Sequence, residues 1–476
     1  MKHRIFLFAL ICCAQLSACS LTEVQNPNIT DDSYLGSPQS TQVWISGVNK
    51  QLALTLNESI VDAEMASDNY FNNSSLSNQI FDLPSLLATD LDVDNMQRAI
   101  AKLTQMAEYG IEKVVPADRD ATGSMRAQLY FLGGYGYLLG AELYKWLPTT
   151  PGSAPGASEE RLRKAIAYFN SASTFETDQA KKNVYALALA RAYYDLGDKT
   201  NAVLNANLVI NAAPMTLQTA VYDGLRSVSN TMQSYTFSNS TNVFAPLPRL
   251  DFLDPKYYTI GTATTDQKPI AILKGEEAFL IAAEAALGRS DIATAKTLLK
   301  RLITEVISVR PRASVNGRLA LRRGTRSDYP LLATVNVKAD ATAPAKSGLV
   351  LDRQAGNISV YTVSGTSVKN ADIDAAATVD DVLYLLCLMR QEVFMSEGRR
   401  MTDLGIRFPV STIEQQNNHN VTPEHTLAVI PAYIPLARGM DDFTYDRAAG
   451  VVTIKHDMNR VLVQRKADAG ILPMMK

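Results

Sequence analysis

Residues 183–214 read NVYALALARAYYDLGDKTNAVLNANLVINAAP and decide the fold of the chain. When Asn183 is counted as position 1, the stretch carries the residues of a tetratricopeptide repeat at their usual places: Ala190 at 8, Tyr193 at 11, Gly197 at 15, Ala202 at 20, Ala206 at 24 and Pro214 at 32. Small residues at 8 and 20 allow two helices to pack closely, and glycine permits the left-handed turn between them. The spacing therefore predicts a helical hairpin that turns at Gly197.

A weaker copy of this pattern surrounds Gly288, with apolar helices expected over residues 278–287 and 292–307. Because three or more such units are normally needed to bury a continuous core, further helices should precede the hairpin. Apolar residues at helical spacing predict them over residues 40–66, 94–116 (with Asp94 as N-cap), 124–147 and 159–175. The fold class we expect is mainly α, with a tetratricopeptide-like scaffold over residues 40–215 and 268–308.

The segments between and after these helices lack a helical period. Residues 216–267 form a loop-rich insertion, and residues 309–476 form a loop-rich C-terminal region around one apolar helix at 380–404. Two short β-hairpins are expected in the C-terminal region, one over residues 348–363 and one over residues 443–455. Irregular insertions of this length in a helical scaffold are usually functional.

The composition is that of an ordinary globular protein, with 46% hydrophobic and 20% charged residues among 476. Lysine and arginine number 46 against 48 aspartates and glutamates, which gives a formal net charge of -2. The chain therefore lacks the basic field that holds nucleic acid, and no nucleic-acid partner is expected.

The N-terminus has the features of an export signal. A short basic region precedes an apolar run over residues 5–14, and the tetrapeptide Leu-Ser-Ala-Cys closes the signal at Cys19. This tetrapeptide resembles a bacterial lipobox, so we expect residues 1–18 to be a signal peptide and Cys19 to carry lipid at the start of an anchored segment, 19–39. An ordinary cleavage site with an incidental cysteine is the alternative. No later segment reaches the roughly 18 apolar residues of a membrane-spanning helix.

The remaining cysteines do not form a disulfide framework. Cys12 and Cys13 lie in the signal peptide, which leaves Cys387 as the other cysteine besides Cys19. With no second thiol to pair with, Cys387 is expected to be a small buried hydrophobic residue of its apolar run.

A second informative stretch, residues 388–404, reads LMRQEVFMSEGRRMTDL. It resembles the signature of the SusD/RagB family of outer-membrane nutrient-binding lipoproteins, in which an Arg-x-Glu helix is followed by Glu-Gly-x-Arg and Asp-Leu. The matching residues are Arg390, Glu392, Glu397, Gly398, Arg400, Asp403 and Leu404. The lipobox, VQNPN at 24–28 and YKWLP at 144–148 agree with the family as well. The C-terminus departs from the family pattern, which indicates a divergent branch.

The resemblance implies a lipoprotein of the outer membrane that faces the cell exterior, binds a glycan or peptide and acts as the lid of a TonB-dependent SusC-like transporter. The rival interpretation is a lipid-anchored tetratricopeptide scaffold for envelope protein assembly that has no small ligand. No cofactor is implied. Because no G-x-S-x-G elbow, P-loop, H-E-x-x-H or G-x-G-x-x-G occurs, we expect no enzymatic activity. His419 and His425 are too loosely spaced to predict a metal site.

The charged residues of the signature are expected to form a buried network that holds the C-terminal helix, with a ligand or partner contact as the alternative. Ligand recognition is instead expected directly after the first helix, at Asp68, Asn69, Tyr70, Phe71 and Asn72. Aromatic faces stack on sugar rings or peptide side chains, and the polar groups bond to hydroxyls or amides. The alternative is a polar turn whose aromatic residues pack under the scaffold.

Three other features of the loops and helices carry predictions. Tyr257 and Tyr258 are a weaker recognition candidate, whereas Trp44 and Trp146 are expected in the core. Six arginines fall in a segment without any acidic residue: Arg310, Arg312, Arg318, Arg322, Arg323 and Arg326. They predict a solvated loop, with contact to anionic lipid or an acidic partner as the alternative.

Overall fold

The computed structural model describes residues 35–72, 77–226, 228–238, 243–260, 262, 264–319, 328–436 and 439–476. The expected signal peptide, Cys19 and three of the clustered arginines (Arg322, Arg323 and Arg326) lie outside these residues. Within them the chain is mainly helical, which confirms the fold class expected from the repeat pattern.

Four long helices form the N-terminal part of the scaffold: α3 (Ser40–Met65), α4 (Leu91–Tyr109), α6 (Gly123–Leu143) and α7 (Ser158–Phe175). α4 and α6 pack on α3, and α7 packs on α6. The buried residues of α3 include Val48, Leu52, Leu56 and Ile60, whose spacing of four brings them to one face of the helix. The periodicity of the sequence therefore accounts for this packing.

Several helix boundaries differ from the expected ones. The helix expected over residues 380–404 ends at Val393, because Ser396 and Gly398 adopt left-handed conformations, and residues 400–403 form a separate short helix. The N-cap of α4 is Asp90 rather than Asp94, because the Asp90 side chain accepts a hydrogen bond from the first turn of the helix. α6 ends at Leu143 rather than at residue 147, since Tyr144 adopts an extended conformation and bridges to a segment much later in the chain. Trp146 consequently lies in a strand and not on a helix.

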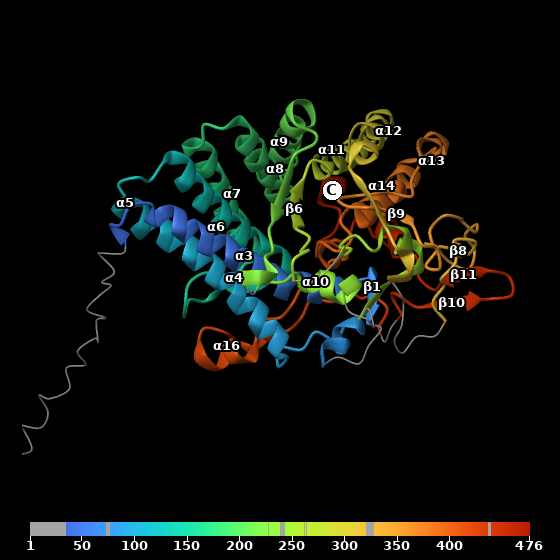
Figure 1. Ribbon diagram of the computed structural model, residues 1–476, viewed down its shortest axis with the longest axis horizontal. Helices are drawn as coiled ribbons and strands as arrows, with labels where there is room; N and C mark the ends of the chain where they lie inside the picture. Colours follow the sequence, from blue (N-terminus) through green and yellow to red (C-terminus); the bar gives the residue numbers. More distant parts are fainter. Residues whose placement is uncertain are drawn as a thin grey trace, which may run out of the picture.

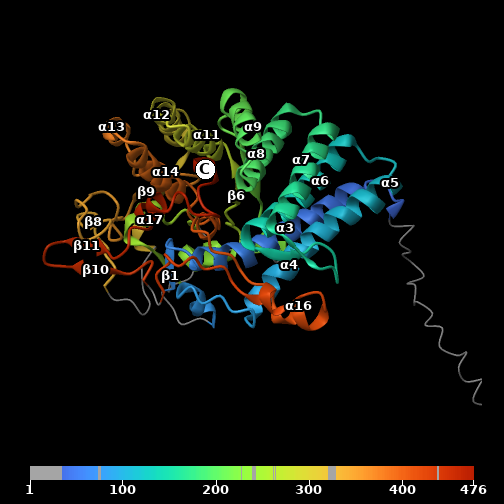
Figure 2. The same ribbon diagram turned by 180° about the vertical axis from the view of Figure 1, so that it is seen from behind.

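The helical hairpin predicted over residues 183–214 is confirmed. α8 (Gln179–Leu196) and α9 (Lys199–Ala212) pack against each other and are joined at Gly197. The weaker copy follows with α11 (Glu276–Gly288) and α12 (Ile292–Arg301), and α11 packs on α9. Figures 1 and 2 show these helices following one another along one edge of the molecule.

The C-terminal part of the chain returns to this scaffold. Its helices are α13 (Asn370–Ala375), α14 (Val379–Val393), α15 (Arg400–Asp403), α16 (Thr412–Asn417) and α17 (Met458–Gln464). α14 packs on α11 and on α17, and its Cys387 is buried as expected. Short helical segments are η1 (Ser77–Asp82), η2 (Gly110–Val114), α5 (Val115–Ala117), η3 (Gly224–Arg226), α10 (Thr231–Gln233), η4 (Ser234–Ser238), η5 (Pro248–Leu253), η6 (Leu302–Val306), η7 (Ile307–Val309), η8 (Gly317–Leu319), η9 (Pro423–Thr426) and η10 (Pro473–Met475).

The strands are short and form small sheets. Antiparallel pairs are β1 (Tyr70–Asn72) with β5 (Phe244–Pro246), β2 (Trp146–Pro148) with β3 (Pro155–Ala157), β4 (Leu217–Ala220) with β6 (Ile270–Lys274), and β7 (Arg312–Val315) with β9 (Ile358–Tyr361). In a three-stranded sheet, β11 (Val451–Ile454) lies between β10 (Phe443–Asp446) and β8 (Asn336–Lys338).

One of the two predicted hairpins is present. β10 and β11 form the hairpin expected over residues 443–455. The hairpin expected over residues 348–363 is wrong, because its second half is β9 and β9 pairs with β7. Ile358 and Val360 of β9 are buried against Val315 of β7, so apolar burial between distant segments overrides the local turn signal.

One hydrophobic core runs from α3 to the C-terminal residues. Trp44 and Trp146, both expected in the core, are only partly buried, and the Trp44 indole donates a hydrogen bond to the Met106 carbonyl at 2.8 Å. None of the helices in the described ranges is long and apolar enough to cross a membrane.

Candidate ligand-binding site

The residues predicted to recognise a ligand directly after α3 are buried. Asp68, Asn69, Tyr70, Phe71 and Asn72 have exposed fractions between 0% and 6%. The last three of them form β1, which pairs with β5 and contacts the segment that follows α14. The prediction of an exposed recognition site at these five residues is therefore corrected, and the alternative of aromatic residues packed under the scaffold describes them.

Of the second pair of predicted recognition residues, one is buried and the other is partly exposed. Tyr257 is buried, and its hydroxyl donates a hydrogen bond to the Ser396 carbonyl at 3.0 Å, so it does not face a ligand from solvent. Tyr258 is partly exposed and packs beside the β7–β9 pair, with the Lys268 ammonium 4.3 Å from its ring centroid. Of the two, Tyr258 alone keeps a surface that a ligand could reach.

The signature residues lie in a buried network of ion pairs. Arg400 holds both carboxylate oxygens of Asp68, at 2.5 and 3.0 Å, and so ties the segment after α14 to the end of α3. Gly398, in the left-handed conformation with a φ of 72°, donates its backbone N–H to Glu64 at 2.7 Å. This hydrogen bond joins the same two segments.

The rest of the signature connects α14 to other elements. Arg390 pairs with Glu284 of α11 at 2.8 Å and approaches Asp403 to 3.7 Å. Glu397 pairs with Lys256 and with Lys274. Burial lowers the pKa of Lys274 to about 8, although the charge of Glu397 opposes this shift.

Glu392, the last signature carboxylate, accepts hydrogen bonds from the Ser367 backbone and hydroxyl and from the Thr366 hydroxyl, at 2.6 to 2.8 Å. These side chains hold segments together, and of those just described Asp403 also lines the first cavity described below. Arg310, one of the clustered arginines, is also buried and pairs with Glu276, whereas Arg312 and Arg318 are exposed.

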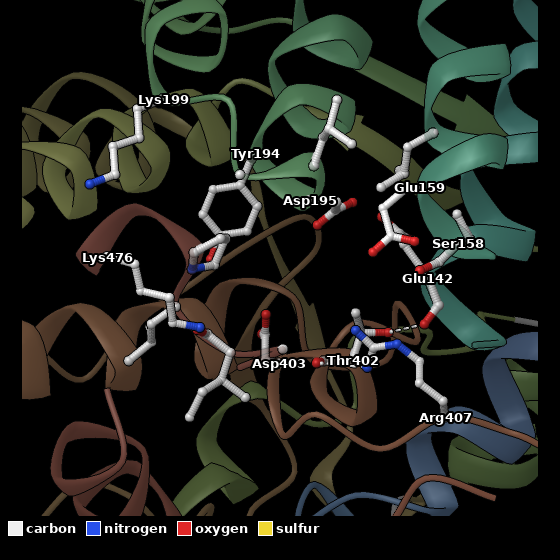
Figure 3. Close-up of a pocket in the computed structure, with 18 residues that line it drawn as sticks. Glu142, Ser158, Glu159, Tyr194, Asp195, Lys199, Thr402, Asp403, Arg407 and Lys476 are labelled. Atoms are coloured by element: carbon white, nitrogen blue, oxygen red, sulfur yellow. Dashed lines mark hydrogen bonds between the residues drawn. The ribbon is translucent and has the colours of Figure 1, made fainter. Parts of the chain in front are cut away.

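A first cavity, of about 370 Å³, lies between α6, α8 and the C-terminal residues 470–476. Figure 3 shows the side chains that surround it, which come from distant parts of the chain. Its charged lining residues are Glu142, Glu159, Asp195, Lys199, Asp403, Arg407 and Lys476. Charged groups of both signs therefore make up seven of its 18 lining residues.

Two acidic side chains at this cavity, Glu142 and Asp195, influence each other's pKa. Asp195 and Glu142 lie within hydrogen-bond reach, and Arg191 binds both oxygens of Glu142 at 2.5 and 2.6 Å. Burial opposes ionisation of Glu142, but the charges of Arg191 and Arg399 outweigh it and lower the Glu142 pKa to about 2. Burial and then the charge of Glu142 raise the pKa of Asp195 well above its usual value. Of the two carboxyl groups, Asp195 therefore binds a proton more readily.

A second cavity, of about 560 Å³, lies between α14, β8, α17 and the loop over residues 339–349. Its apolar lining residues are Val337, Ala339, Ala343, Pro344, Ala345, Leu349, Leu385 and Leu388. Its polar lining residues include Arg249, Lys346, Tyr384, Asp457 and Arg460. Ligand pockets in proteins are mostly apolar with a few convergent polar groups, a description that the second cavity fits better than the first.

Sequence reasoning missed both cavities. The first could have been suspected from Arg191 and Asp195, two charges one helical turn apart inside an apolar helix. Arg249 carries no such signal, because it lies in the insertion over residues 216–267, which has no helical period, and its neighbours are known only from the tertiary structure.

Comparison with known proteins finds likeness in structure only. No family model matches the chain, and no curated protein matches it in sequence. A SusD superfamily protein from Bacteroides vulgatus superposes with a TM-score of 0.54 at 12% identity, covering 82% of this chain and 98% of that one. SusD superfamily proteins from Bacteroides fragilis (TM-score 0.52, 13% identity, 81% and 99% covered) and Bacteroides thetaiotaomicron (0.51, 14%, 82% and 98%) are similarly close. The chain thus has the SusD-like fold that residues 388–404 predicted.

Proposed function

We propose that the chain is a SusD/RagB-type lipoprotein of the outer membrane, anchored through lipid on Cys19 and facing the cell exterior. It binds a nutrient, either a glycan or a peptide, and acts as lid and partner of a TonB-dependent SusC-like transporter. The observation that carries the proposal is the SusD-like fold over 82% of the chain. The lipobox-like tetrapeptide that ends at Cys19 supports it as well.

The two halves of this function fall on different parts of the molecule. The helical scaffold exposes Leu204 and Leu208 of α9, with exposed fractions of 58% and 53% and one helical turn apart, and exposed apolar side chains of this kind support contact with a protein partner. The irregular face holds the larger, mostly apolar cavity, which supports binding of a nutrient there.

The partner is tested by purifying the full-length chain from native membranes in mild detergent. We expect a TonB-dependent barrel transporter to co-purify in stoichiometric amount. Leu204→Glu with Leu208→Glu should weaken that association, because two charges would enter the apolar contact, whereas Lys199→Glu at the start of the same helix should not. Envelope assembly proteins in place of a barrel would favour the tetratricopeptide scaffold instead.

The anchor is tested with Cys19→Ala, which should leave the chain uncleaved or soluble because the diacylated thiol is lost. Cys387→Ala is the matched control, since Cys387 is buried and carries no lipid in this proposal. The measurement is the partition of each variant with outer membranes after a high-salt wash. A Cys19→Ala chain that stays in that fraction would overturn the anchor.

A further inference from the structure

Eight of the 17 residues that line the second cavity are aliphatic, and several of them keep accessible surface. Leu349 and Leu388 are 7% and 8% exposed, and Leu385, one helical turn before Leu388 on α14, is partly exposed. Pro344 and Ala345, in the loop that borders the cavity, are exposed. Burial of such surface against an apolar group is favourable, so these residues favour a ligand with an aliphatic or aromatic side chain.

The hydroxyl groups of the cavity lining are already used by the chain. Three of them donate a hydrogen bond to a carboxylate at 2.6 to 2.7 Å: Tyr384 to Asp457, Thr342 to Asp340 and Ser367 to Glu392. A sugar in this cavity would have to compete for these bonds or place its own hydroxyls against aliphatic side chains. A hydroxyl that is buried without a partner is costly, which disfavours a glycan here.

The cavity also offers little aromatic surface for stacking on a sugar ring. Tyr384 is the aromatic residue of its lining. The guanidinium of Arg460 lies over this ring, 4.0 Å from the centroid, and so covers one of its two faces. The accessible surface that remains for a ligand is therefore mainly that of the aliphatic residues.

A donor and an acceptor at the same cavity suit a peptide backbone. Arg460 is exposed, and no hydrogen bond of its guanidinium is seen within the described ranges. Asp340 accepts its three hydrogen bonds, from Thr342 and Ala343, through Oδ1, which leaves Oδ2 as an acceptor. Every peptide unit carries a C=O and an N–H beside its side chains, and these two groups could pair with them.

We propose that the second cavity binds an apolar side chain of a peptide, so that the nutrient is a peptide and not a glycan. Leu349, Leu385 and Leu388 contact this side chain, while Arg460 and Asp340 pair with the peptide backbone. The volume of about 560 Å³ lies within the range of small-ligand pockets. The inference rests on the proposed nutrient-binding function and names its ligand class.

The test measures binding by calorimetry to the full-length chain, without the transporter, in a zwitterionic detergent that has no sugar head group. The probes are trileucine, triglycine and maltotriose. Triglycine has the same backbone and terminal charges as trileucine but no side chains. We expect trileucine to bind at least tenfold more tightly than triglycine, and maltotriose not to bind at millimolar concentration.

Three variants locate the site. Leu385→Asp should weaken trileucine binding at least tenfold, because a charge would enter the apolar contact. Ala345→Trp, at an exposed position of the lining, should block the cavity and keeps the test valid if Leu385→Asp folds poorly. Leu225→Asp is the matched control: Leu225 is 74% exposed and does not line the cavity, so this variant should bind trileucine like the unaltered chain.

Equal binding of trileucine and triglycine, full binding of trileucine by both Leu385→Asp and Ala345→Trp, or no binding of trileucine at millimolar concentration would overturn the inference. Maltotriose that binds the unaltered chain but not Ala345→Trp would overturn it as well, and the proposed nutrient-binding function would then stand with a glycan as its ligand. The transporter and the anchor are tested separately, so their failure is distinguishable from the failure of this site.

Discussion

The ring of Tyr70 lies 5.7 Å from that of Phe244, and its hydroxyl meets the Ser396 hydroxyl at 2.6 Å. The side chain is fully buried and joins β1 to the segment after α14. Two residues earlier in the chain, Asp68 is held by Arg400, so both of these polar side chains serve the interior. A residue with the chemistry of a sugar-stacking platform is here a part of the core.

Tyr70→Ala is therefore expected to lower the free energy of unfolding, by about 3 to 5 kcal/mol, the cost of truncating a large buried aromatic side chain. Urea unfolding followed by circular dichroism measures it. Tyr258→Ala is the matched control, since that ring is partly exposed and its loss should cost clearly less. If Tyr70→Ala unfolded at the same urea concentration as the unaltered chain, the burial of this ring would be contradicted.

At the scale of elements, the hairpin of α8 and α9 depends on its turn. Gly197 has a φ of 78°, and its N–H and that of Asp198 bond to the last turn of α8. The Asp198 side chain then caps α9 by accepting a hydrogen bond from the Asn201 N–H. One short segment thus ends one helix and begins the next.

Gly197→Val should destabilise the protein by about 1 kcal/mol or more, because a β-branched residue is strained in the left-handed region. A Cβ at Gly197 would meet no neighbour within 4 Å, so the backbone alone accounts for the cost. Gly356→Val is the control, as Gly356 also faces open space but has no positive φ. If Gly197→Val and Gly356→Val unfolded at the same temperature in a thermal scan, the turn assignment would be wrong.

At the scale of the whole molecule, ionic groups from α6, α8, α11 and the C-terminal part meet in the interior. Arg191 and Arg399 both approach Glu142 and Glu277, and Asp195 adds a carboxyl group with a raised pKa at the edge of the cavity in Figure 3. Such a buried network links stability to pH, because its pKa values differ between the folded and the unfolded chain.

Asp195→Asn tests this link. Since the folded chain raises the pKa of Asp195 above the ordinary 3.8, folded molecules bind more protons there, and the contribution of Asp195 to stability is lost as pH rises. An asparagine at this position can donate a hydrogen bond to Glu142 but does not titrate. Between about pH 5 and about pH 8 the free energy of unfolding should therefore fall less in the variant than in the unaltered chain. Glu142, with its lowered pKa, acts in the opposite sense and only in acid.

Urea unfolding at both pH values gives the comparison. Asp178→Asn, at the exposed N-cap of the same helix, is the control and should keep the pH dependence of the unaltered chain. If Asp195→Asn kept the pH dependence of the unaltered chain, that dependence would not arise from Asp195.

Features that depend on neighbours along the chain could be predicted from the sequence alone. The repeat spacing predicted the α8–α9 hairpin and its turn at Gly197, periodic apolar residues predicted α3, and a turn signal predicted the β10–β11 hairpin. Residues 388–404 predicted the SusD-like fold. The helix and turn patterns arise from backbone geometry within a few residues, so they can be recognised along the chain. The SusD-like fold was instead implied by the resemblance of residues 388–404 to a known family.

Only the tertiary structure decided which side chains are buried and which remain accessible. Asp68 to Asn72 looked suited to a ligand until Arg400, from the far end of the chain, was found beside them. β9 took β7 as its partner in preference to its sequence neighbours, and Arg249 came to line a cavity with residues from α14 and α17. Burial and the pairing of charges depend on contacts between segments hundreds of residues apart, and no local pattern specifies those contacts.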